Sequence, residues 1–153
     1  MAIKAKTIVD IKADATVISH SRTDVDVRDL TVTIDEPIAR GGTNLGPSPT
    51  ETVPVALASC LSVISHKVAE NLGVHLAYMS IGVVAKFDRR GVTLSEEIDV
   101  PFVQMDVEIK VTTTATPEEI EVFRTDVGRF CPVSKMLRQS GTVVNENWNV
   151  TYA

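Results

Sequence analysis

The sequence predicts an α+β fold with a mostly antiparallel sheet around one long buried helix. Two observations carry this prediction. Runs in which every second residue is apolar, typical of half-buried strands, occur near both ends and in the middle of the chain. Between them, one stretch is apolar on all sides at helical spacing, and two shorter helix signals follow late in the chain. At 153 residues we expect a single domain over residues 1–153.

The amino-terminal third alternates apolar and polar residues. Apolar or small residues share one parity from Ile3 to Val17, which predicts a strand or hairpin. The segment SHSRTD (19–24) interrupts this pattern as a turn, and Leu30, Val32 and Ile34 restore it. The segment DEPIARGGTNLGPSP (35–49) is rich in glycine and proline near its end, so we expect a loop there.

A long helix follows this loop. Ser48-Pro49-Thr50-Glu51 fits a capping box, in which Ser and Glu satisfy backbone N–H groups at a helix start, and Gly73 is placed to end the helix. Because apolar residues occur all round it, we expect a buried central helix. Pro54 conflicts with a start at Ser48, since it lies about one turn inside. Either it kinks the first turn or the helix begins later.

The second half of the chain alternates strand and helix signals. Strands are expected over 81–87 and 103–111, and again over 144–152. Thr116-Pro117-Glu118-Glu119 is a second capping box, opening a helix with Ile120, Phe123 and Val127 inward. A short helix should begin at Pro132 and close at Gly141.

Charge and composition exclude several classes of function. The chain carries 20 acidic and 15 basic residues, a net charge of −5, which argues against nucleic-acid and anionic-membrane partners. The start lacks the apolar core of a signal peptide, and the apolar stretch 53–64 is too short to span a bilayer, so we expect a cytoplasmic protein. The three histidines and two cysteines lack metal-ligand spacing, so we expect no zinc site.

The two cysteines are the strongest candidates for chemistry. Cys60 lies on the long helix, where it is either a small buried apolar residue or a reactive thiolate. Cys131 directly precedes Pro132, where the N–H groups and dipole of a helix start stabilise a thiolate. If the fold brings them together, one sulfur can react with an oxidant and the other can capture the resulting sulfenic acid as a disulfide. Their spacing alone leaves this open.

Glu51 and three arginines are the candidates for activating Cys60. Glu51 has either a purely structural role in the capping box or the role of orienting an arginine. Nine residues separate it from Cys60, about half a turn in projection, so Glu51 serves Cys60 of its own chain only if Pro54 bends the helix. We favour the alternative that Glu51 acts on Cys60 of a partner subunit. Three arginines precede the long helix, namely Arg22 in a turn, Arg28 in a strand and Arg40 in the loop. Each is either a solvated surface charge or the cation that favours the Cys60 thiolate.

These segments resemble the OsmC/Ohr family of organic hydroperoxide and osmotic-stress proteins. The resemblance lies in DEPIARGGTNLGPSPTETVPVALASC (35–60), in HKVAENLGV (66–74) and in FCPVSKML (130–137). The family pattern is a DEP…GG segment, a G-x-x-P-x-E helix start, a cysteine nine residues after the glutamate, and a later Cys-Pro. The order of expected strands and helices also resembles the family over nearly the whole chain.

The resemblance implies an intertwined homodimer with two active sites at the interface. In it, Cys60 is the peroxidatic and Cys131 the resolving cysteine, and Glu51 holds an arginine against the thiolate. One branch of the family takes this arginine from an early loop, which favours Arg22, whereas the RGG segment favours Arg40. The implied reaction reduces an organic hydroperoxide to its alcohol, with an external dithiol reductant and no metal or flavin.

Two other functions are weighed against this one. A non-enzymatic protein could bind a small apolar ligand on the same scaffold, with structural cysteines. A cysteine hydrolase would need a histidine base beside Cys60. His66 lies about 240° around the helix from Cys60, and nothing in the sequence positions His20 or His75, so a hydrolase is disfavoured.

Overall fold

The computed structural model describes residues 7–153, which form an α+β fold with two three-stranded sheets and three α-helices. This confirms the predicted fold class. The chain divides into two compact units, one ending at Thr52 and one from Val53 to Ala153. The expectation of a single domain over 1–153 stays a prediction.

The amino-terminal unit contains the antiparallel sheet β1-β2-β3. Its strands are β1 (Asp14–Val17), β2 (Thr23–Val27) and β3 (Leu30–Ile34). The predicted long first strand is wrong over residues 7–13, which are not in a strand, and its residues 3–6 lie outside the described part. The reason is that β2 is only five residues long and pairs with 14–17 alone, so the alternating residues before Asp14 have no strand beside them.

Arg28 lies in a turn and not, as predicted, in a strand. Val27 pairs with Leu30, which leaves Arg28 and Asp29 as a two-residue hairpin loop. Such tight loops require positive φ angles, and Arg28 has φ +59°.

A buried carboxylate organises the loop after β3. Asp35 is fully buried, and its Oδ2 accepts hydrogen bonds from the N–H of Thr43 at 3.0 Å and of Leu45 at 3.1 Å. Backbone passes so close to Gly42 and Gly46 that a Cβ atom would lie 1.7 Å from the Glu36 carbonyl and 2.0 Å from the Thr33 carbonyl, respectively. The predicted loop therefore has a fixed conformation, which includes the 3₁₀ turn η1 (Ile38–Arg40).

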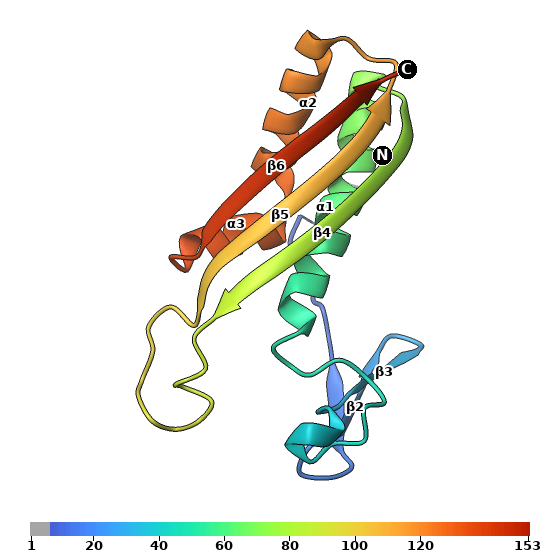
Figure 1. Ribbon diagram of the computed structural model, residues 1–153. Coiled ribbons are helices and arrows are strands. Elements are labelled where there is room, and N and C mark those ends of the chain that lie inside the picture. The colour runs from blue at the N-terminus through green and yellow to red at the C-terminus, as the bar shows by residue number, and fades with distance from the viewer. Residues whose placement is uncertain (1–6) are drawn as a thin grey trace. The chain divides into compact units, whose positions relative to one another are not determined.

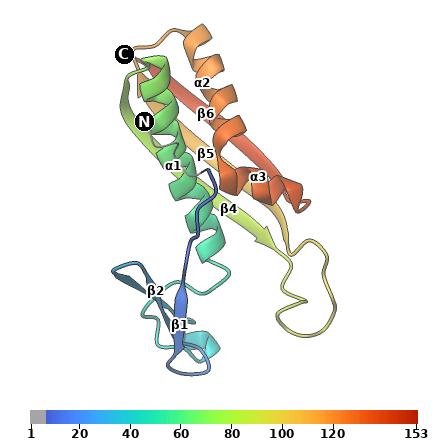
Figure 2. The ribbon, with the colours of Figure 1, turned by 180° about the vertical axis from the view of Figure 1, so that it is seen from behind.

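The carboxy-terminal unit is a three-stranded sheet with all its helices on one face (Figures 1 and 2). The strands are β4 (Leu76–Phe87), β5 (Phe102–Thr113) and β6 (Val143–Tyr152), and the helices are α1 (Thr52–Leu72), α2 (Pro117–Phe130) and α3 (Pro132–Gln139). Strands β4 and β5 are antiparallel. Strands β5 and β6 are parallel, because α2 and α3 carry the chain back to the start of the sheet.

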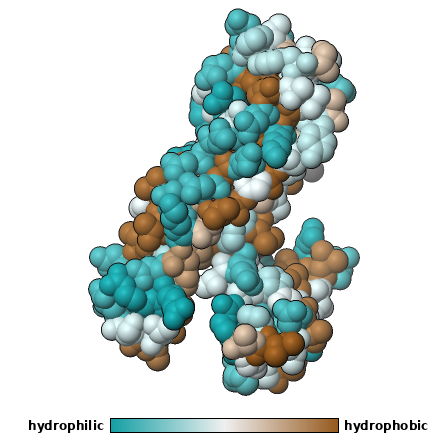
Figure 3. Space-filling model, in the orientation of Figure 1, coloured by the Kyte–Doolittle hydropathy of each residue, from teal (hydrophilic) through white to brown (hydrophobic). Residues whose placement is uncertain are grey.

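The core lies between this sheet and the helices. Met105, Val107, Ile109 and Val111 of β5 are buried, as the alternation predicted. Helix α2 begins with the predicted capping box at Thr116 and contributes its predicted inward residues, Ile120, Phe123 and Val127. The alternate residues of β5 include Glu108 and Lys110, and the outer face of the sheet is a mixture of hydrophilic and hydrophobic residues (Figure 3).

Helix α1 begins later than the capping box predicted. Its first helical residue is Thr52, so Pro54 falls within the first turn, where its missing N–H has no helical partner. The predicted box is half formed: the Glu51 carboxylate accepts hydrogen bonds from the N–H of Ser48 at 2.7 Å and from its hydroxyl at 2.8 Å. Pro54 therefore needs no kink.

Only one side of α1 is buried within the chain, which corrects the prediction of burial all round. Leu57, Leu61 and Val68 pack into the core, whereas Val55 and Val63 are more than half exposed. The single sheet of the carboxy-terminal unit covers one side of the helix and leaves the other uncovered.

Helix α1 is long and apolar enough to cross a membrane. The core helix of a soluble protein can have the same length and hydropathy. At 21 residues it is longer than the apolar stretch 53–64, so length alone does not exclude a span. Its packing into the core favours a soluble protein, and the absence of a membrane partner stays a prediction.

Replacing Phe123 tests the packing of α2 on the sheet. Its ring is fully buried and stands edge-on to Trp148, with 5.7 Å between ring centroids. Phe123→Ala should lower the free energy of unfolding by about 3–5 kcal/mol, measured by urea unfolding. The neighbouring Val122 is 52% exposed, so Val122→Ala should change it by less than about 1 kcal/mol. Equal effects of the two variants would contradict this packing.

Candidate functional site

The structure brings the two cysteines together. The Sγ atoms of Cys60, on α1, and Cys131, between α2 and α3, lie 3.4 Å apart, with the Cys131 thiol donating. Both thiols are free, Cys131 is fully buried and Cys60 is half-buried. Two sulfurs at this distance are in contact and need to approach by only about 1.4 Å to reach a disulfide bond length of about 2.0 Å.

The backbone holds Cys131 at the junction of two helices. Its N–H donates to the carbonyl of Val127, closing α2, and its carbonyl accepts from the N–H of Lys135, opening α3, each at 3.0 Å. Pro132 takes the first position of α3, as predicted, since its missing N–H has no helical partner there. Cys131 is therefore the cap of both helices, which fixes its Cα–Cβ direction toward α1.

Burial raises the pKa of the Cys131 thiol to about 11. The N–H groups of Ser134 and Val133 at the start of α3 lower it, but by less than desolvation raises it, and the neighbouring Cys60 raises it further. The N–H groups at the start of α3 thus favour a thiolate, in the direction predicted, but loss of water outweighs them. At neutral pH, Cys131 is a thiol that donates its proton toward Cys60.

Glu51 belongs to the amino-terminal unit. Its carboxylate accepts two hydrogen bonds from Ser48, as described above. The N–H of Ser48, then its hydroxyl and then the charge of Arg40 hold the pKa of Glu51 below its usual range. Glu51 is thus ionised at neutral pH and lies within electrostatic reach of Arg40.

The three candidate arginines also lie in the amino-terminal unit. Arg22 makes a two-point ion pair with Asp24 at 3.1 and 2.9 Å, which raises the pKa of Arg22. Arg40 makes an ion pair with Glu36 at 2.6 Å and is exposed. Arg28 is exposed at its hairpin. Of the three, Arg40 is the one whose charge acts on Glu51.

No histidine within residues 7–153 makes a hydrogen bond to either sulfur. His66 is exposed, and its Nδ1 interacts with the carbonyl of Ser62 in its own helix at 2.8 Å. This agrees with the expectation that His66 faces away from Cys60.

A groove of about 320 Å³ lies between residues of α1 and α2. It is lined by Ile64, Lys67, Val68, Asn71, Asp126 and Phe130. Ile64 lies one turn after Cys60, and Phe130 directly precedes Cys131, but neither cysteine lines the groove. This groove was not predicted from the sequence. A signal for one of its walls was present, since positions 64, 67 and 71 recur at helical spacing.

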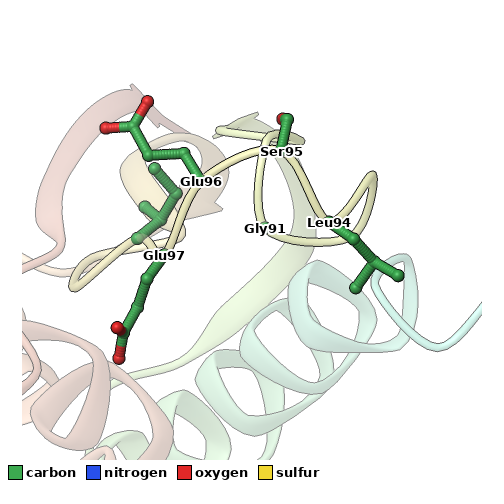
Figure 4. A pocket seen from close by; sticks show the side chains of 6 residues that line it. Gly91, Leu94, Ser95, Glu96 and Glu97 are labelled. Atoms are coloured by element: carbon green, nitrogen blue, oxygen red, sulfur yellow. The ribbon is translucent and has the colours of Figure 1, made fainter.

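A larger hollow, of about 570 Å³, lies in the connection between β4 and β5 (Figure 4). Its labelled side chains include the carboxylates of Glu96 and Glu97, whereas Leu94 points away from them. Glu96 pairs with Arg90, and the Ser95 hydroxyl donates to the Arg90 carbonyl. Its lining contains no cysteine or histidine, so this hollow offers no nucleophile for the chemistry of the sulfur pair.

Comparison with known proteins places the chain in a family. The family described as OsmC-like protein matches residues 42–147. The chain belongs to the OsmC-like family. The match includes Glu51, Cys60 and Cys131, whereas Arg22, Arg28 and Arg40 lie outside it. A search of curated proteins found no match.

Solved structures of OsmC-like proteins share the fold. An OsmC-like protein from Mycoplasma pneumoniae is 17% identical, with a TM-score of 0.78 over 94% of this chain and 99% of that one. An organic hydroperoxide resistance protein OsmC from Legionella pneumophila is 18% identical, with a TM-score of 0.63 over 95% and 99%. The organic hydroperoxide resistance protein OhrB of Bacillus subtilis is 18% identical, with a TM-score of 0.57 over 94% and 98%. The resemblance predicted from sequence is confirmed at the level of family and fold.

The high pKa of Cys131 predicts slow alkylation. In freshly reduced, folded protein, iodoacetamide should modify Cys131 slowly at pH 8 and faster as the pH approaches about 11, because only the thiolate reacts. Peptide mass spectrometry measures the modified fraction. In urea, where the thiol has its ordinary pKa of about 8.5, Cys131 should react readily at pH 8. Equal rates at pH 8 in the two states would contradict its burial.

The same shift predicts a pH dependence of stability. The folded-state pKa lies above the unfolded one, so the contribution of this thiol is fully present below about pH 8.5 and is lost as the pH rises through about 11. Cys131→Ala should therefore lose less stability than wild type between about pH 8.5 and pH 11, measured by urea unfolding at each pH. A parallel loss in both proteins would contradict the shift.

Proposed function

We propose that this protein is a thiol-dependent peroxidase that reduces organic hydroperoxides to alcohols. The observation that carries the proposal is the 3.4 Å contact between a half-buried and a fully buried cysteine. A lone buried cysteine is ordinary packing, but two sulfurs 71 residues apart in sequence and in contact are a dithiol ready to form a disulfide.

The reaction proceeds in three balanced steps. The Cys60 thiolate attacks the terminal oxygen of R–O–O–H, an S–O bond forms, the O–O bond breaks, and the alkoxide takes a proton to become the alcohol. Cys131 then attacks the Cys60 sulfenic acid, and its thiol proton leaves with the hydroxyl as water. An external dithiol reduces the Cys60–Cys131 disulfide and is itself oxidised to a disulfide. No metal or flavin takes part in this scheme.

The unequal burial of the two cysteines supports these roles. Cys60 is half-buried and not fully enclosed, so a peroxide can reach it. Cys131 is fully buried and protonated at neutral pH, so it does not compete for the peroxide. Its thiol donates toward the Cys60 sulfur, so the two sulfurs already face one another.

We assign the activating group to a second copy of the chain. Glu51 and Arg40, which act on one another in the amino-terminal unit, would face Cys60 of a partner subunit in an intertwined homodimer, with Arg22 as the second candidate. The exposed Val55 and Val63 on α1 support such a partner, since it would cover them. In the active site, the carboxylate would hold the guanidinium against the thiolate and the peroxide oxygen.

The relatives agree with a role in peroxide defence. Two of the structurally similar proteins are described as organic hydroperoxide resistance proteins, from Legionella pneumophila and Bacillus subtilis. We extend that role to this chain on the strength of its own sulfur pair, and we expect it to act in the cytoplasm, where dithiol reductants keep cysteines reduced.

Single cysteine variants test the chemistry. With a dithiol present, wild type should consume cumene hydroperoxide faster than hydrogen peroxide, and Cys60→Ser should be slower by at least about 100-fold. Cys131→Ser should reduce about one equivalent and stop at a Cys60 sulfenic acid, which dimedone traps and mass spectrometry maps. Peroxide-treated wild type should contain the Cys60–Cys131 disulfide.

The same assay can also contradict the peroxidase proposal. If wild type and Cys60→Ser consume peroxide alike, the chain is not a cysteine peroxidase. Native mass spectrometry that then finds a co-purified apolar molecule would favour the alternative function, a ligand-binding protein.

Replacing the arginines singly tests the assignment of the activating group. Arg40→Gln should slow both peroxide reduction and the alkylation of Cys60 at pH 7 by about 10-fold, because less of the thiol is ionised without the cation. Glu51→Gln should act in the same direction. Arg28→Gln is the matched control and should have no effect, since Arg28 is exposed at a hairpin. A larger effect of Arg22→Gln than of Arg40→Gln would contradict the choice of Arg40.

A further inference from the structure

We propose that Cys60 and Cys131 together form a binding site for monosubstituted trivalent arsenicals, the compounds R–As(OH)₂ and R–As=O. The ligand is held by two covalent arsenic–sulfur bonds, one to each cysteine. The inference goes beyond the proposed peroxidase function, because binding needs only the reduced sulfur pair and no peroxide. Its basis is the distance between the two sulfurs, their number and their burial.

The distance between the two sulfur atoms fits a single bridging arsenic atom. Trivalent arsenic forms three bonds in a pyramid, and its bond angles are near a right angle because a lone pair occupies the fourth position. Two bonds of about 2.3 Å, a length close to that of a zinc–thiolate bond, then hold their sulfurs about 3.3 Å apart. The Sγ atoms of Cys60 and Cys131 are 3.4 Å apart. The reduced protein therefore has the spacing of the chelate before arsenic arrives.

Thiophilic metal ions fit the same pair less well. A tetrahedral ion such as zinc needs sulfurs about 3.8 Å apart and two further ligands. No cluster of three or more His, Cys, Asp and Glu side chains within residues 7–153 could hold a metal ion. A linear copper(I) bis-thiolate needs sulfurs more than about 4 Å apart and has a net negative charge, which is costly beside the fully buried Cys131. The arsenical product is neutral.

The number of sulfurs selects arsenicals with one organic substituent. The chain has two cysteines in all, so an arsenic atom bound here keeps one bond for another group. In R–As=O that bond is already made to carbon, whereas arsenite would have to retain a hydroxyl. Cys131 belongs to the hydrophobic core and Cys60 packs against it. These surroundings favour an apolar substituent over a hydrated hydroxyl.

The binding reaction is balanced without an oxidant or a reductant. The half-buried Cys60 reacts first: an S–As bond forms, an As–OH bond breaks, and the thiol proton leaves with the hydroxyl as water. Cys131 then forms the second S–As bond, and its proton leaves with the second hydroxyl. Because its sulfur is in contact with that of Cys60, Cys131 reaches the arsenic without exposure to bulk solvent.

Intact-protein mass spectrometry of the reduced protein tests the site. With equimolar phenylarsine oxide, wild type should gain one phenylarsenic unit and lose two thiol hydrogens. Excess mercaptoethanol, a monothiol, should not remove the arsenic, whereas 2,3-dimercaptopropanol should. Cys60→Ser and Cys131→Ser should each hold it at least about 100-fold more weakly, because one bond replaces two. Arsenite should bind wild type more weakly than phenylarsine oxide does.

Urea unfolding separates a preformed pair from two ordinary thiols. In the unfolded chain the cysteines are 71 residues apart, so closing the chelate costs loop entropy. Phenylarsine oxide should therefore bind folded wild type at least about 10-fold more tightly than the unfolded chain, and should raise the urea midpoint. Cys60→Ser is the matched control: it keeps the buried Cys131, and its midpoint should not rise.

The outcomes distinguish this inference from the peroxidase function. If wild type loses arsenic to mercaptoethanol as readily as Cys60→Ser does, or if its urea midpoint does not rise, the arsenical site is overturned whatever the peroxidase assay gives. Arsenite binding as tight as that of phenylarsine oxide overturns the choice of monosubstituted arsenicals. If wild type binds phenylarsine oxide as expected but reduces no hydroperoxide, the arsenical site stands and the peroxidase function alone fails.

Discussion

The proposed chemistry depends on one contact, between a sulfur in the middle of α1 and a sulfur at the junction of α2 and α3. This contact requires that the two thiols are not ionised together. Two full negative charges 3.4 Å apart would repel by about 5 kcal/mol at an effective dielectric constant of about 20. Burial of Cys131 prevents this, because it raises the pKa of that thiol to about 11 while leaving Cys60 half-buried. The fold thus places two identical side chains in different surroundings, one fully buried and one half-buried.

The junction keeps this arrangement fixed. Cys131 caps two helices at once, and each helix is anchored in the core on its own side of the junction, α2 by Phe123 and Val127 and α3 by Leu137. A cysteine on a loop would need to lose conformational freedom before it could meet a sulfenic acid. Here the backbone bonds of the helices have already removed that freedom, so the step to a disulfide needs only a small approach of the sulfurs.

Local patterns predicted those elements that local physics determines. The capping box at Thr116 and the inward residues of α2 depend on neighbours three or four positions away, and the structure has them as predicted. The first strand was predicted too long because alternation at residues 7–13 does not reveal whether a partner strand lies beside it. The parallel pairing of β5 and β6 joins residues about forty positions apart and has no signature in either strand.

In the candidate site, too, local features were predicted from the sequence and those that depend on tertiary packing were not. Sequence motifs identified Cys60 and Cys131. They did not show whether burial or the helix N–H groups would have the larger effect on the pKa of Cys131. Its position at a helix start was readable and favours a thiolate, whereas its burial depends on the packing of the whole core, which contains residues from other elements. The groove was missed for a related reason, since one wall comes from α1 and the other from α2, and no single pattern contains both.

Helix α1 links the stability of the protein to its proposed chemistry. Its core-facing residues, Leu57, Leu61 and Val68, set the rotation of the helix against the sheet. Cys60 is displaced from Leu57 by three residues, about 60° around the helix axis, so the same rotation decides where its sulfur points. A rotation of one residue, about 100°, would move the Cys60 sulfur away from that of Cys131. The packing of the core thereby fixes the position of the reactive sulfur.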